Sequence, residues 1–289
     1  MGWWDERAGL SGTVAVITGG AGGLGRGITL DLAANGVKVA ILDKDEAAVE
    51  EITAALADTE TDAIVKLGDV RDPDVLAALF TQTDDRWGRL DTLVNVVGGT
   101  FKGAFSDSSP KAWDALLRAN LSHVLHASSL AIPRMRSGQR GGSIINITTI
   151  EAHRAAPNFA VYSAAKAAVT QFARTLAIEL APDGIRVNCV APDITPTPNM
   201  IAISGEGGAG MIDPAGAKVA IPMGRVGTID DISNSVVFLA SGLSSYITGA
   251  TLHPDGGAIA SSGWFNWPQD GFMNTLPRDV AAFLAPKDK

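Results

Sequence analysis

The sequence has one cysteine, Cys189, among its 289 residues. A lone cysteine cannot form an intramolecular disulfide, which is typical of proteins in a reducing compartment. Cys189 lies in the apolar run RVNCVA, so we interpret it as a small core residue. The first residues, MGWWDERAGLSG, have neither the basic nor the apolar region of a signal peptide. We therefore expect a cytoplasmic protein.

Long apolar runs, basic clusters and metal-ligand spacings are also missing. No apolar run approaches the ~18 residues that a membrane-spanning helix needs. The formal net charge is −8 and no cluster of Lys or Arg offsets it, which argues against a nucleic-acid surface. No group of His, Cys and Asp has metal-ligand spacing, so we expect no catalytic metal. What is present is a chain with 46% apolar and 19% charged residues, enough to bury a sizeable core.

Short apolar segments alternate with helix-length segments along the chain. Near-continuous apolar strands in such an alternation predict a parallel sheet covered on both faces. We expect an α/β fold: a Rossmann-type, doubly wound, seven-stranded parallel sheet in a single domain spanning 1–289. The predicted core is 10–257, with a flexible substrate lid at about 193–224 and a C-terminal extension at 258–289. The expected strands lie within 13–18, 37–43, 63–70, 90–99, 142–149, 185–192 and 248–257.

A glycine-rich turn, TGGAGGLG, joins the first expected strand to the first expected helix at 18–25. Glycines there let the backbone approach a pyrophosphate, and the N-terminus of the following helix carries partial positive charge toward it. A glycine-rich turn alone is a weak signal, but its position in the strand–helix pair strengthens it. We assign Gly19, Gly23, Leu24 and Gly25 to the cofactor site.

Acidic and small residues follow the next strands. Asp43 ends the second strand, where a carboxylate can accept hydrogen bonds from the adenosine ribose and repels a 2′-phosphate. Lys44 is the one neighbouring feature that favours NADP. Because the Asp43 carboxylate repels a 2′-phosphate, we predict NAD as the cofactor and NADP as the less favoured choice. Asp69, with Val70, ends the third strand and can meet the adenine amino group. The NVVGG segment, including Asn95 and Gly98, ends the fourth strand, and its small residues let the cofactor pass.

Tyr162 and Lys166 are four residues apart in a segment that is predicted to be helical. They therefore share one helix face. An ammonium group beside a phenol stabilises the phenolate and lowers the phenol pKa from about 10. The pair could thus act as a general acid and base near neutral pH.

Taken in order, these pieces resemble the classical short-chain dehydrogenase/reductase family. The resemblance covers about 10–257, and so many pieces in one order are highly specific. The matching pieces are TGGAGGLG, Asp43, GDV at 68–70, NVVG at 95–98, RANL at 118–121, YSAAK at 162–166, IRVNCVAP at 185–192, RVG at 225–227 and DGG at 255–257.

The resemblance implies a role for each matching residue. Tyr162 would transfer a proton to or from the substrate oxygen, and Lys166 would hold the nicotinamide ribose and lower the pKa of Tyr162. Asn120 would help to order a water in a proton relay. Thr149 stands at the place of the family's catalytic serine, and Thr197 matches the threonine that touches the nicotinamide carboxamide. Pro192 belongs to the same cofactor-binding motif.

Three departures from the family's pattern stand out. Two valines fill the middle of NVVG, Asp193 follows Pro192 where the family has glycine, and Thr149 replaces serine. Threonine keeps the hydroxyl, which donates one hydrogen bond and accepts others, but its methyl group narrows the pocket. Thr148 is the rival hydroxyl; as the strand neighbour of Thr149 it should point to the opposite face.

The sequence does not decide the role of two further groups of residues. Glu151, His153 and Arg154 lie on the loop before Tyr162, where they could bind substrate or be solvated loop charges. The C-terminal extension carries a group of aromatic residues between 264 and 272 that would be a liability if exposed in a monomer. We expect it to pack on its own subunit or on a neighbouring one in a homo-oligomer, a tetramer or dimer. These aromatic residues are Trp264, Phe265, Trp267 and Phe272.

The predicted function is an NAD-dependent oxidoreductase that transfers hydride between the nicotinamide and a secondary alcohol or ketone, apolar or cyclic. One alternative is a 3-oxoacyl-carrier-protein reductase that uses NADP(H), although Asp43 and the acidic net charge count against it. A further alternative is a non-catalytic dinucleotide-binding regulatory protein. Its signature would be the loss of Tyr162, Lys166 or Asn120, all of which are present.

Overall fold

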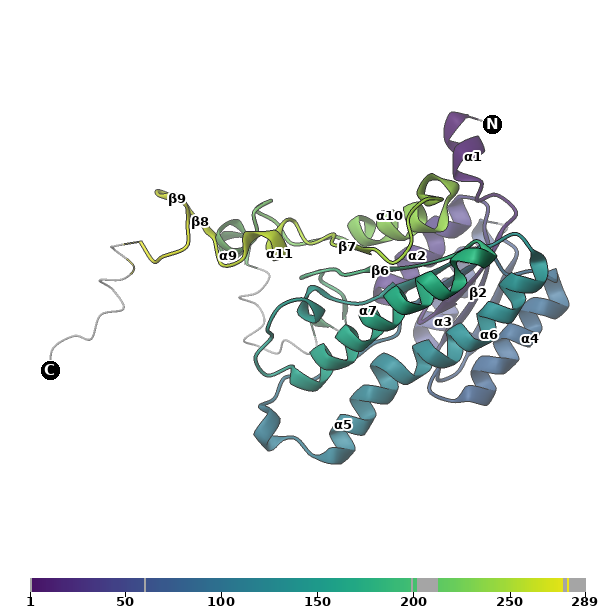
Figure 1. Cartoon of the computed structure of the whole chain (residues 1–289), viewed down its shortest axis with the longest axis horizontal. Helices are drawn as coiled ribbons and strands as arrows, with labels where there is room; N and C mark the ends of the chain where they lie inside the picture. Colours follow the sequence, from purple (N-terminus) through teal and green to yellow (C-terminus); the bar gives the residue numbers. More distant parts are fainter. Residues whose placement is uncertain (1, 60, 199, 202–212, 278–279, 281–289) are drawn as a thin grey trace, which may run out of the picture.

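The computed structural model of the chain describes residues 2–59, 61–198, 200–201, 213–277 and 280. Its centre is a parallel sheet of seven strands in the order β3-β2-β1-β4-β5-β6-β7 (Figure 1). The predicted seven-stranded Rossmann-type sheet in a single domain is therefore confirmed. The strands are β1 (Val14–Thr18), β2 (Lys38–Asp43), β3 (Ala63–Leu67), β4 (Thr92–Asn95), β5 (Gly142–Ile147), β6 (Ile185–Val190) and β7 (Thr251–Leu252).

Helices cover both faces of the sheet, as the apolar strands predicted. Strands β1 and β4 are neighbours, but the chain leaves them toward opposite edges of the sheet, which makes their carboxyl ends the switch point where ligands bind in such folds. One face carries α2 (Gly23–Ala34), α3 (Glu46–Asp58) and α10 (Ile229–Ala240), and the other carries α4 (Pro73–Trp87), α6 (His123–Gly138) and α7 (Ala160–Leu180).

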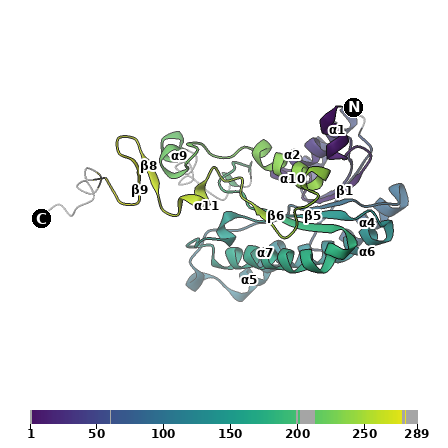
Figure 2. The same cartoon turned by 45° about the horizontal axis from the view of Figure 1, so that its top comes forward.

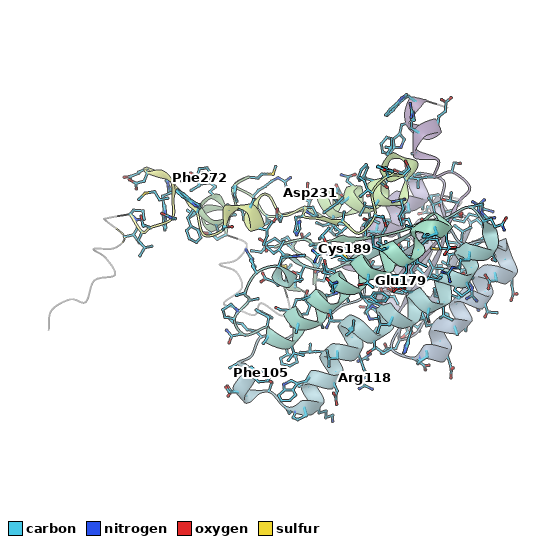
Figure 3. All side chains as sticks on the ribbon, in the orientation of Figure 1. Phe105, Arg118, Glu179, Cys189, Asp231 and Phe272 are labelled. Carbon is cyan, nitrogen blue, oxygen red and sulfur yellow. The ribbon has the colours of Figure 1, made fainter. Side chains whose placement is uncertain are left out.

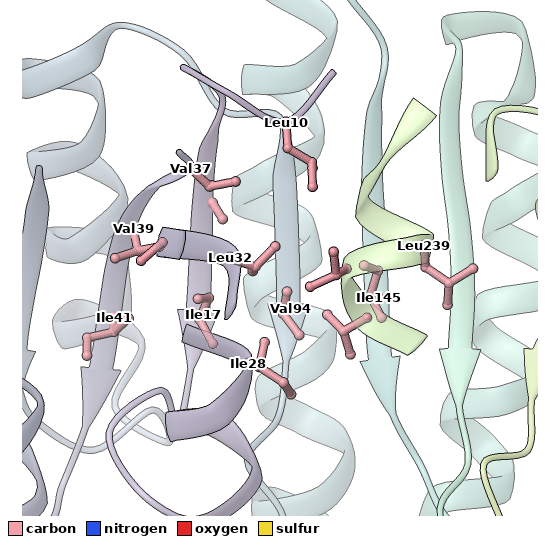
Figure 4. Close-up of a cluster of buried hydrophobic side chains, with 14 of the residues drawn as sticks. Leu10, Ile17, Ile28, Leu32, Val37, Val39, Ile41, Val94, Ile145 and Leu239 are labelled. Carbon is pink, nitrogen blue, oxygen red and sulfur yellow. The ribbon is translucent and has the colours of Figure 1, made fainter. Parts of the chain in front are cut away.

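Two apolar clusters hold these layers together. In the first, Ile28 and Leu32 of α2 pack against Ile17 of β1 and Val94 of β4, and all four side chains are fully buried (Figure 4). The second cluster, on the other face, includes the fully buried Phe80 of α4. Each fully buried side chain of this size stabilises the fold by roughly 1.5–3 kcal/mol, so the strands that carry the site residues stand on a rigid base.

The helix boundaries follow local signals in the sequence. The side chain of Asp72 accepts hydrogen bonds from the backbone nitrogens of Asp74 and Val75 and thereby caps α4, which satisfies donors that a helix end leaves unpaired. Helix α2 ends at Asn35–Gly36, where Gly36 has a φ of +76°, a conformation that glycine adopts without strain. Both helix boundaries therefore lie at residue types that favour the start or the end of a helix.

The helical stretch between Ser109 and Gly138 is not one continuous α-helix. The structure forms α5 (Pro110–Leu117), then a π-helical turn at Arg118–Ser122, then α6. A π turn inserts one extra residue into the helix and often marks a functional position. Here the insertion includes Asn120.

Some segments that follow β6 lie beyond the carboxyl end of the sheet. Figures 1 and 2 both show α9 (Pro214–Ala220) and α11 (Ala258–Ser261) there, with a hairpin of β8 (Phe265–Trp267) and β9 (Gly271–Met273). This hairpin was not predicted from the sequence. Phe272 lies on it, apart from the helices that carry Arg118 and Glu179 (Figure 3). The predicted lid at 193–224 falls partly outside the described residues.

The N-terminus adds one short helix, α1 (Trp3–Ala8). Among the helices that the structure describes, none is long and apolar enough to cross a membrane.

Candidate active site

A cavity of about 1040 Å³ opens at the carboxyl ends of the strands. It extends from the loops after β1, β2 and β3, which carry Gly19, Asp43 and Asp69, to Tyr162 and Lys166 on α7. This volume is at the upper end of the range for small-molecule sites. One continuous cavity therefore joins the predicted nucleotide end to the predicted chemical end.

The glycine-rich turn brings the N-terminus of α2 to this cavity. A Cβ atom on Gly25 would lie 1.7 Å from the carbonyl oxygen of Gly19, so only glycine permits α2 to begin so close to β1. Gly19, Gly23 and Leu24 line the cavity, whereas Gly25 does not. Gly25 thus shapes the turn, and a phosphate at this helix end would meet backbone N–H groups.

Asp43 connects the end of β2 to the same turn. Its carboxylate accepts hydrogen bonds from the backbone nitrogen of Ala21 at 3.1 Å and from that of Asp45 at 3.2 Å. These contacts hold the carboxylate in the wall of the cavity, where Lys44 and Asp45 also lie. An ionised carboxylate has lone pairs left for a pair of ribose hydroxyls.

Asp69 is paired with an arginine that the sequence interpretation missed. The Nε of Arg71 donates to both carboxylate oxygens of Asp69 at 2.9 Å, and these bonds hold the pKa of Asp69 at about 2. Asp69, Val70 and Arg71 all line the cavity. A basic residue two positions after Asp69 was the signal that could have revealed this pair.

Tyr162 and Lys166 lie one turn apart on α7, as the spacing predicted. The hydroxyl groups of Thr149 and Tyr162 are hydrogen-bonded to each other, and the Thr149 hydroxyl also accepts from the backbone nitrogen of Glu151 at 3.3 Å. The Thr148 hydroxyl instead donates to the carbonyl of Val190 at 3.3 Å. The structure thus brings Thr149, rather than Thr148, to the phenol.

Lys166 is buried and its Nζ donates to the carbonyl oxygen of Ile147 at 3.0 Å. Asn120 lies nearby: its Nδ2 donates to the carbonyl of Gly99 at 2.8 Å, and its Oδ1 accepts from the nitrogen of the same residue at 3.1 Å. A Cβ atom on Gly98 would lie 2.9 Å from the Nζ of Lys166 and 3.1 Å from the Oδ1 of Asn120. These two polar atoms therefore converge on the space beside Gly98.

The protonation of the phenol differs from the sequence expectation. Burial raises the pKa of Tyr162 to about 12, and the hydrogen bond from Thr149 opposes this shift only in part. Burial also lowers the pKa of the Lys166 ammonium group to about 8. The expected lowering of the Tyr162 pKa by Lys166 is wrong for the protein alone, because burial outweighs the other influences on the phenol.

The remaining predicted residues divide into two groups. Pro192 and Thr197 line the cavity, and the carbonyl of Pro192 accepts from the nitrogen of Ile150 at 3.1 Å. Asn95 is buried behind the cavity, where its Nδ2 donates to the Oδ1 of Asn146 at 2.9 Å. Asn95 therefore links β4 to β5 and does not line the cavity, because the strand ends only after it.

The loop before α7 contributes more to the cavity than the sequence indicated. Glu151 and Arg154 line it, and the apolar stretch 155–157 and Phe159 lie beside them. His153 packs edge-on against His253 instead, with 4.8 Å between the ring centroids. The sequence left open whether these loop charges bind substrate or are solvated, because loop residues carry no periodic pattern that would place them.

Comparison with known proteins agrees with this geometry. A family profile described as Enoyl-(Acyl carrier protein) reductase matches residues 19–258. The chain is 35% identical to a cyclohexanol dehydrogenase of Rhodococcus sp. (strain TK6), over 87% of this chain and 98% of that protein. It is 36% identical to the 3-oxoacyl-[acyl-carrier-protein] reductase FabG of Staphylococcus aureus (strain N315), over 84% and 96% of the two chains.

A solved structure is similar over the same length. It is a short-chain type dehydrogenase/reductase from Mycobacterium marinum, with a TM-score of 0.79 and 28% identity over 86% of this chain and 96% of that chain. The residues that the family profile matches, 19–258, include the Tyr162–Lys166 pair. The chain belongs to the classical short-chain dehydrogenase/reductase family and is an NAD(P)-dependent oxidoreductase that acts on alcohols or ketones.

Proposed function

We propose that this enzyme interconverts a secondary alcohol and a ketone with NAD, and that its substrate is apolar or cyclic. The observation that carries the proposal is that one continuous cavity has the Asp43 carboxylate at one end and the hydrogen-bonded Thr149–Tyr162 pair at the other. A dinucleotide fits such a cavity, because the α2 N-terminus lies between these two ends. Similarity to a cyclohexanol dehydrogenase supports a cyclic alcohol.

In the oxidation direction, the Tyr162 phenolate accepts the proton of the substrate hydroxyl. Thr149 holds the substrate oxygen with its own hydroxyl and positions it against the phenol. The carbon–hydrogen bond of the carbinol breaks with its electron pair, and the product is the ketone. Bound NAD would supply the acceptor for that hydride, and the positive charge of its nicotinamide would favour the phenolate of Tyr162.

Lys166 and Asn120 support this proton transfer. Lys166 would bind the nicotinamide ribose and carry the proton of Tyr162 onward, and Asn120 would hold a water in the space beside Gly98. A group with a pKa of about 8 exchanges protons readily near neutral pH. The cofactor-binding roles of Gly19, Gly23, Leu24 and Thr197 follow from their places around the cavity.

The NAD preference rests on Asp43, whose carboxylate would repel the 2′-phosphate of NADP. The second candidate is the reduction of 3-oxoacyl groups on a carrier protein with NADPH. It is favoured by the similarity to FabG and by the presence of Lys44, Arg71 and Lys102 in the cavity wall. Arg71 is already bound to Asp69, so it is less able to hold a phosphate.

A panel of cyclic alcohols, linear alcohols and 3-oxoacyl thioesters tests the proposal. Wild-type enzyme should oxidise cyclohexanol with NAD, and Tyr162→Phe should lower kcat/KM by at least about 10²-fold because it removes the proton acceptor. Equal turnover by Tyr162→Phe would contradict the assigned chemistry. Preference for a 3-oxoacyl thioester with NADPH would favour the second candidate.

A further inference from the structure

An ion-paired network lies next to the phenol at the substrate end of the cavity. Arg154 donates to the Oε1 of Glu151 at 2.8 Å and to the Oδ1 of Asp193 at 3.4 Å, both through its Nη2. The three residues all line the cavity. They come from two different loops: Glu151 and Arg154 follow β5, and Asp193 follows β6.

The network is acidic as a whole. The guanidinium of Arg154 faces two carboxylates, those of Glu151 and Asp193. A third carboxylate, that of Asp255, is close enough to raise the pKa of Arg154. The Asp193 side chain is only 11% exposed, so its charge is screened little by water. An anionic group on a substrate would meet net repulsion here, and a neutral substrate would not.

Asp193 has capacity for a further hydrogen bond. Its carboxylate interacts with Arg154 at the long distance of 3.4 Å and with the backbone of Ile194, whereas an ionised carboxylate offers about four lone-pair sites. Hydroxyl groups are donors that fit such an acceptor, and a hydrogen bond to a charged group is stronger than one between neutral groups.

Apolar residues that follow Arg154 in the chain also line the cavity. They are Ala155, Ala156 and Phe159. A substrate bound beside these residues would therefore contact them with hydrocarbon and would place a hydrogen-bond donor against the Asp193 carboxylate.

We propose that Asp193, held by Arg154 and Glu151, binds a second hydroxyl group of an uncharged diol or hydroxyketone and excludes substrates that carry a carboxylate or phosphate near the reacting carbon. This inference rests on the proposed alcohol oxidation and names its substrate class. Asp193 is a specificity-determining residue, and Tyr162 remains the group that transfers the proton.

Three ring compounds test the proposal: cyclohexanol, trans-1,2-cyclohexanediol and 3-hydroxycyclohexanecarboxylate. For the wild-type enzyme with NAD, kcat/KM for the diol should exceed that for cyclohexanol by about tenfold, the effect of one hydrogen bond to a charged group. The carboxylate should be about tenfold poorer than cyclohexanol. A diol that is no better than cyclohexanol would overturn the proposal.

Two variants locate the effect at Asp193. Asp193→Gly should bring the diol-to-cyclohexanol ratio of kcat/KM close to one, because it removes the carboxylate that accepts the second hydroxyl. Asp193→Asn keeps the side-chain volume and removes the charge, so the carboxylate-to-cyclohexanol ratio should rise about tenfold as Arg154 loses one carboxylate partner. Asp114→Asn, an exposed residue of α5, removes the same charge outside the cavity and should leave both ratios unchanged.

Binding separates this inference from the proposed function. Calorimetry with wild type and Asp193→Asn, in the presence of NADH, measures the affinity for each of the three compounds without turnover. Selective binding of the diol, lost in the variant, supports the inference even if no alcohol is oxidised, which would contradict the proposed function instead. Ratios that are the same in wild type and both variants would overturn the inference whatever the turnover.

Discussion

Thr149 decides how the phenol of Tyr162 meets its substrate. Its hydroxyl is bonded to the phenol, and that bond opposes the rise in the Tyr162 pKa that burial causes. Thr149 is 8% exposed. If its hydroxyl were removed, water could therefore not easily take over the hydrogen bond to the phenol. The added methyl, relative to serine, takes up space beside the substrate oxygen and leaves the hydrogen bond intact.

Removal of the Thr149 hydroxyl should therefore lower activity sharply. We expect Thr149→Val, which keeps the shape, to reduce kcat/KM by roughly 10²–10³-fold, the usual effect of losing one positioned donor. Thr149→Ser should retain activity and accept bulkier alcohols. Steady-state kinetics of both variants measures this, and full activity in Thr149→Val would show that another hydroxyl holds the substrate.

The pKa of Tyr162 gives the pH dependence its sign. Oxidation requires the phenolate, and burial raises the phenol pKa to about 12, so kcat/KM for the alcohol should rise with pH from 6 to beyond 8. Reduction requires the protonated phenol, so kcat/KM for the ketone should stay level or fall over the same range. Profiles in both directions check this, and an oxidation rate that falls with rising pH would contradict it.

The loop after β4 brings the polar groups of two helices together. Lys166 comes from α7 and Asn120 from the π turn between α5 and α6, and both lie against Gly98. A strand end, a helix and a π turn must therefore keep their positions for the proton relay to work.

Two neighbouring glycines provide a matched test of this arrangement. Gly98→Ala would place a methyl 2.9 Å from the Nζ of Lys166 and should lower kcat by at least about tenfold. A Cβ atom on Gly99 meets nothing within 4 Å, so Gly99→Ala should keep most of the activity. Comparison of kcat and Tm for the two variants tests the relay, and equal activities would contradict it.

The elements differ in how far the sequence predicted them. The strands were predicted correctly, because a sheet that is buried on both faces needs apolar runs in the sequence. The shared helix face of Tyr162 and Lys166 was also predicted correctly, because residues four apart lie on one face of a helix. The π turn around Asn120, the Asp69–Arg71 pair and the hairpin β8–β9 were not. A single inserted residue, a local ion pair and a short strand pair outside the core leave no periodic pattern.

The site was predicted at the level of residue types but not of environment. Glycines, Asp43 and Tyr162 can be found in the sequence because each type has a distinct chemical use. The raised pKa of Tyr162 depends on burial by segments far apart in the chain, and the Glu151–Arg154–Asp193 network depends on two loops meeting. Such effects follow from tertiary packing alone.

At the scale of the whole molecule, the C-terminal extension lies outside the seven-stranded sheet and forms the separate hairpin β8–β9. Strand β8 of the hairpin contacts α9. Trp264, directly before β8, and Phe272, on β9, are 47% and 52% exposed. Exposed aromatic residues grouped on one projection are typical of an interaction surface. We propose, as the sequence analysis expected, that the extension packs on a neighbouring subunit of a homo-oligomer.

The aromatic residues of the hairpin should therefore hold subunits together. The double variant Trp264→Ser, Phe272→Ser should shift the mass in sedimentation velocity toward a smaller species or raise the KM for the alcohol. Tyr246→Ser, at a fully exposed aromatic outside the extension, is the control and should change neither. An unchanged mass and KM in the double variant would rule out this role.

The central claim is that one cavity binds NAD through Asp43 and oxidises an alcohol at Tyr162. The ratio of kcat/KM for NAD to that for NADP, measured with cyclohexanol as the alcohol, tests it most directly. We predict a ratio of at least about ten, because the Asp43 carboxylate repels a 2′-phosphate. A ratio below one, or the absence of cyclohexanol oxidation with either cofactor, would contradict the account.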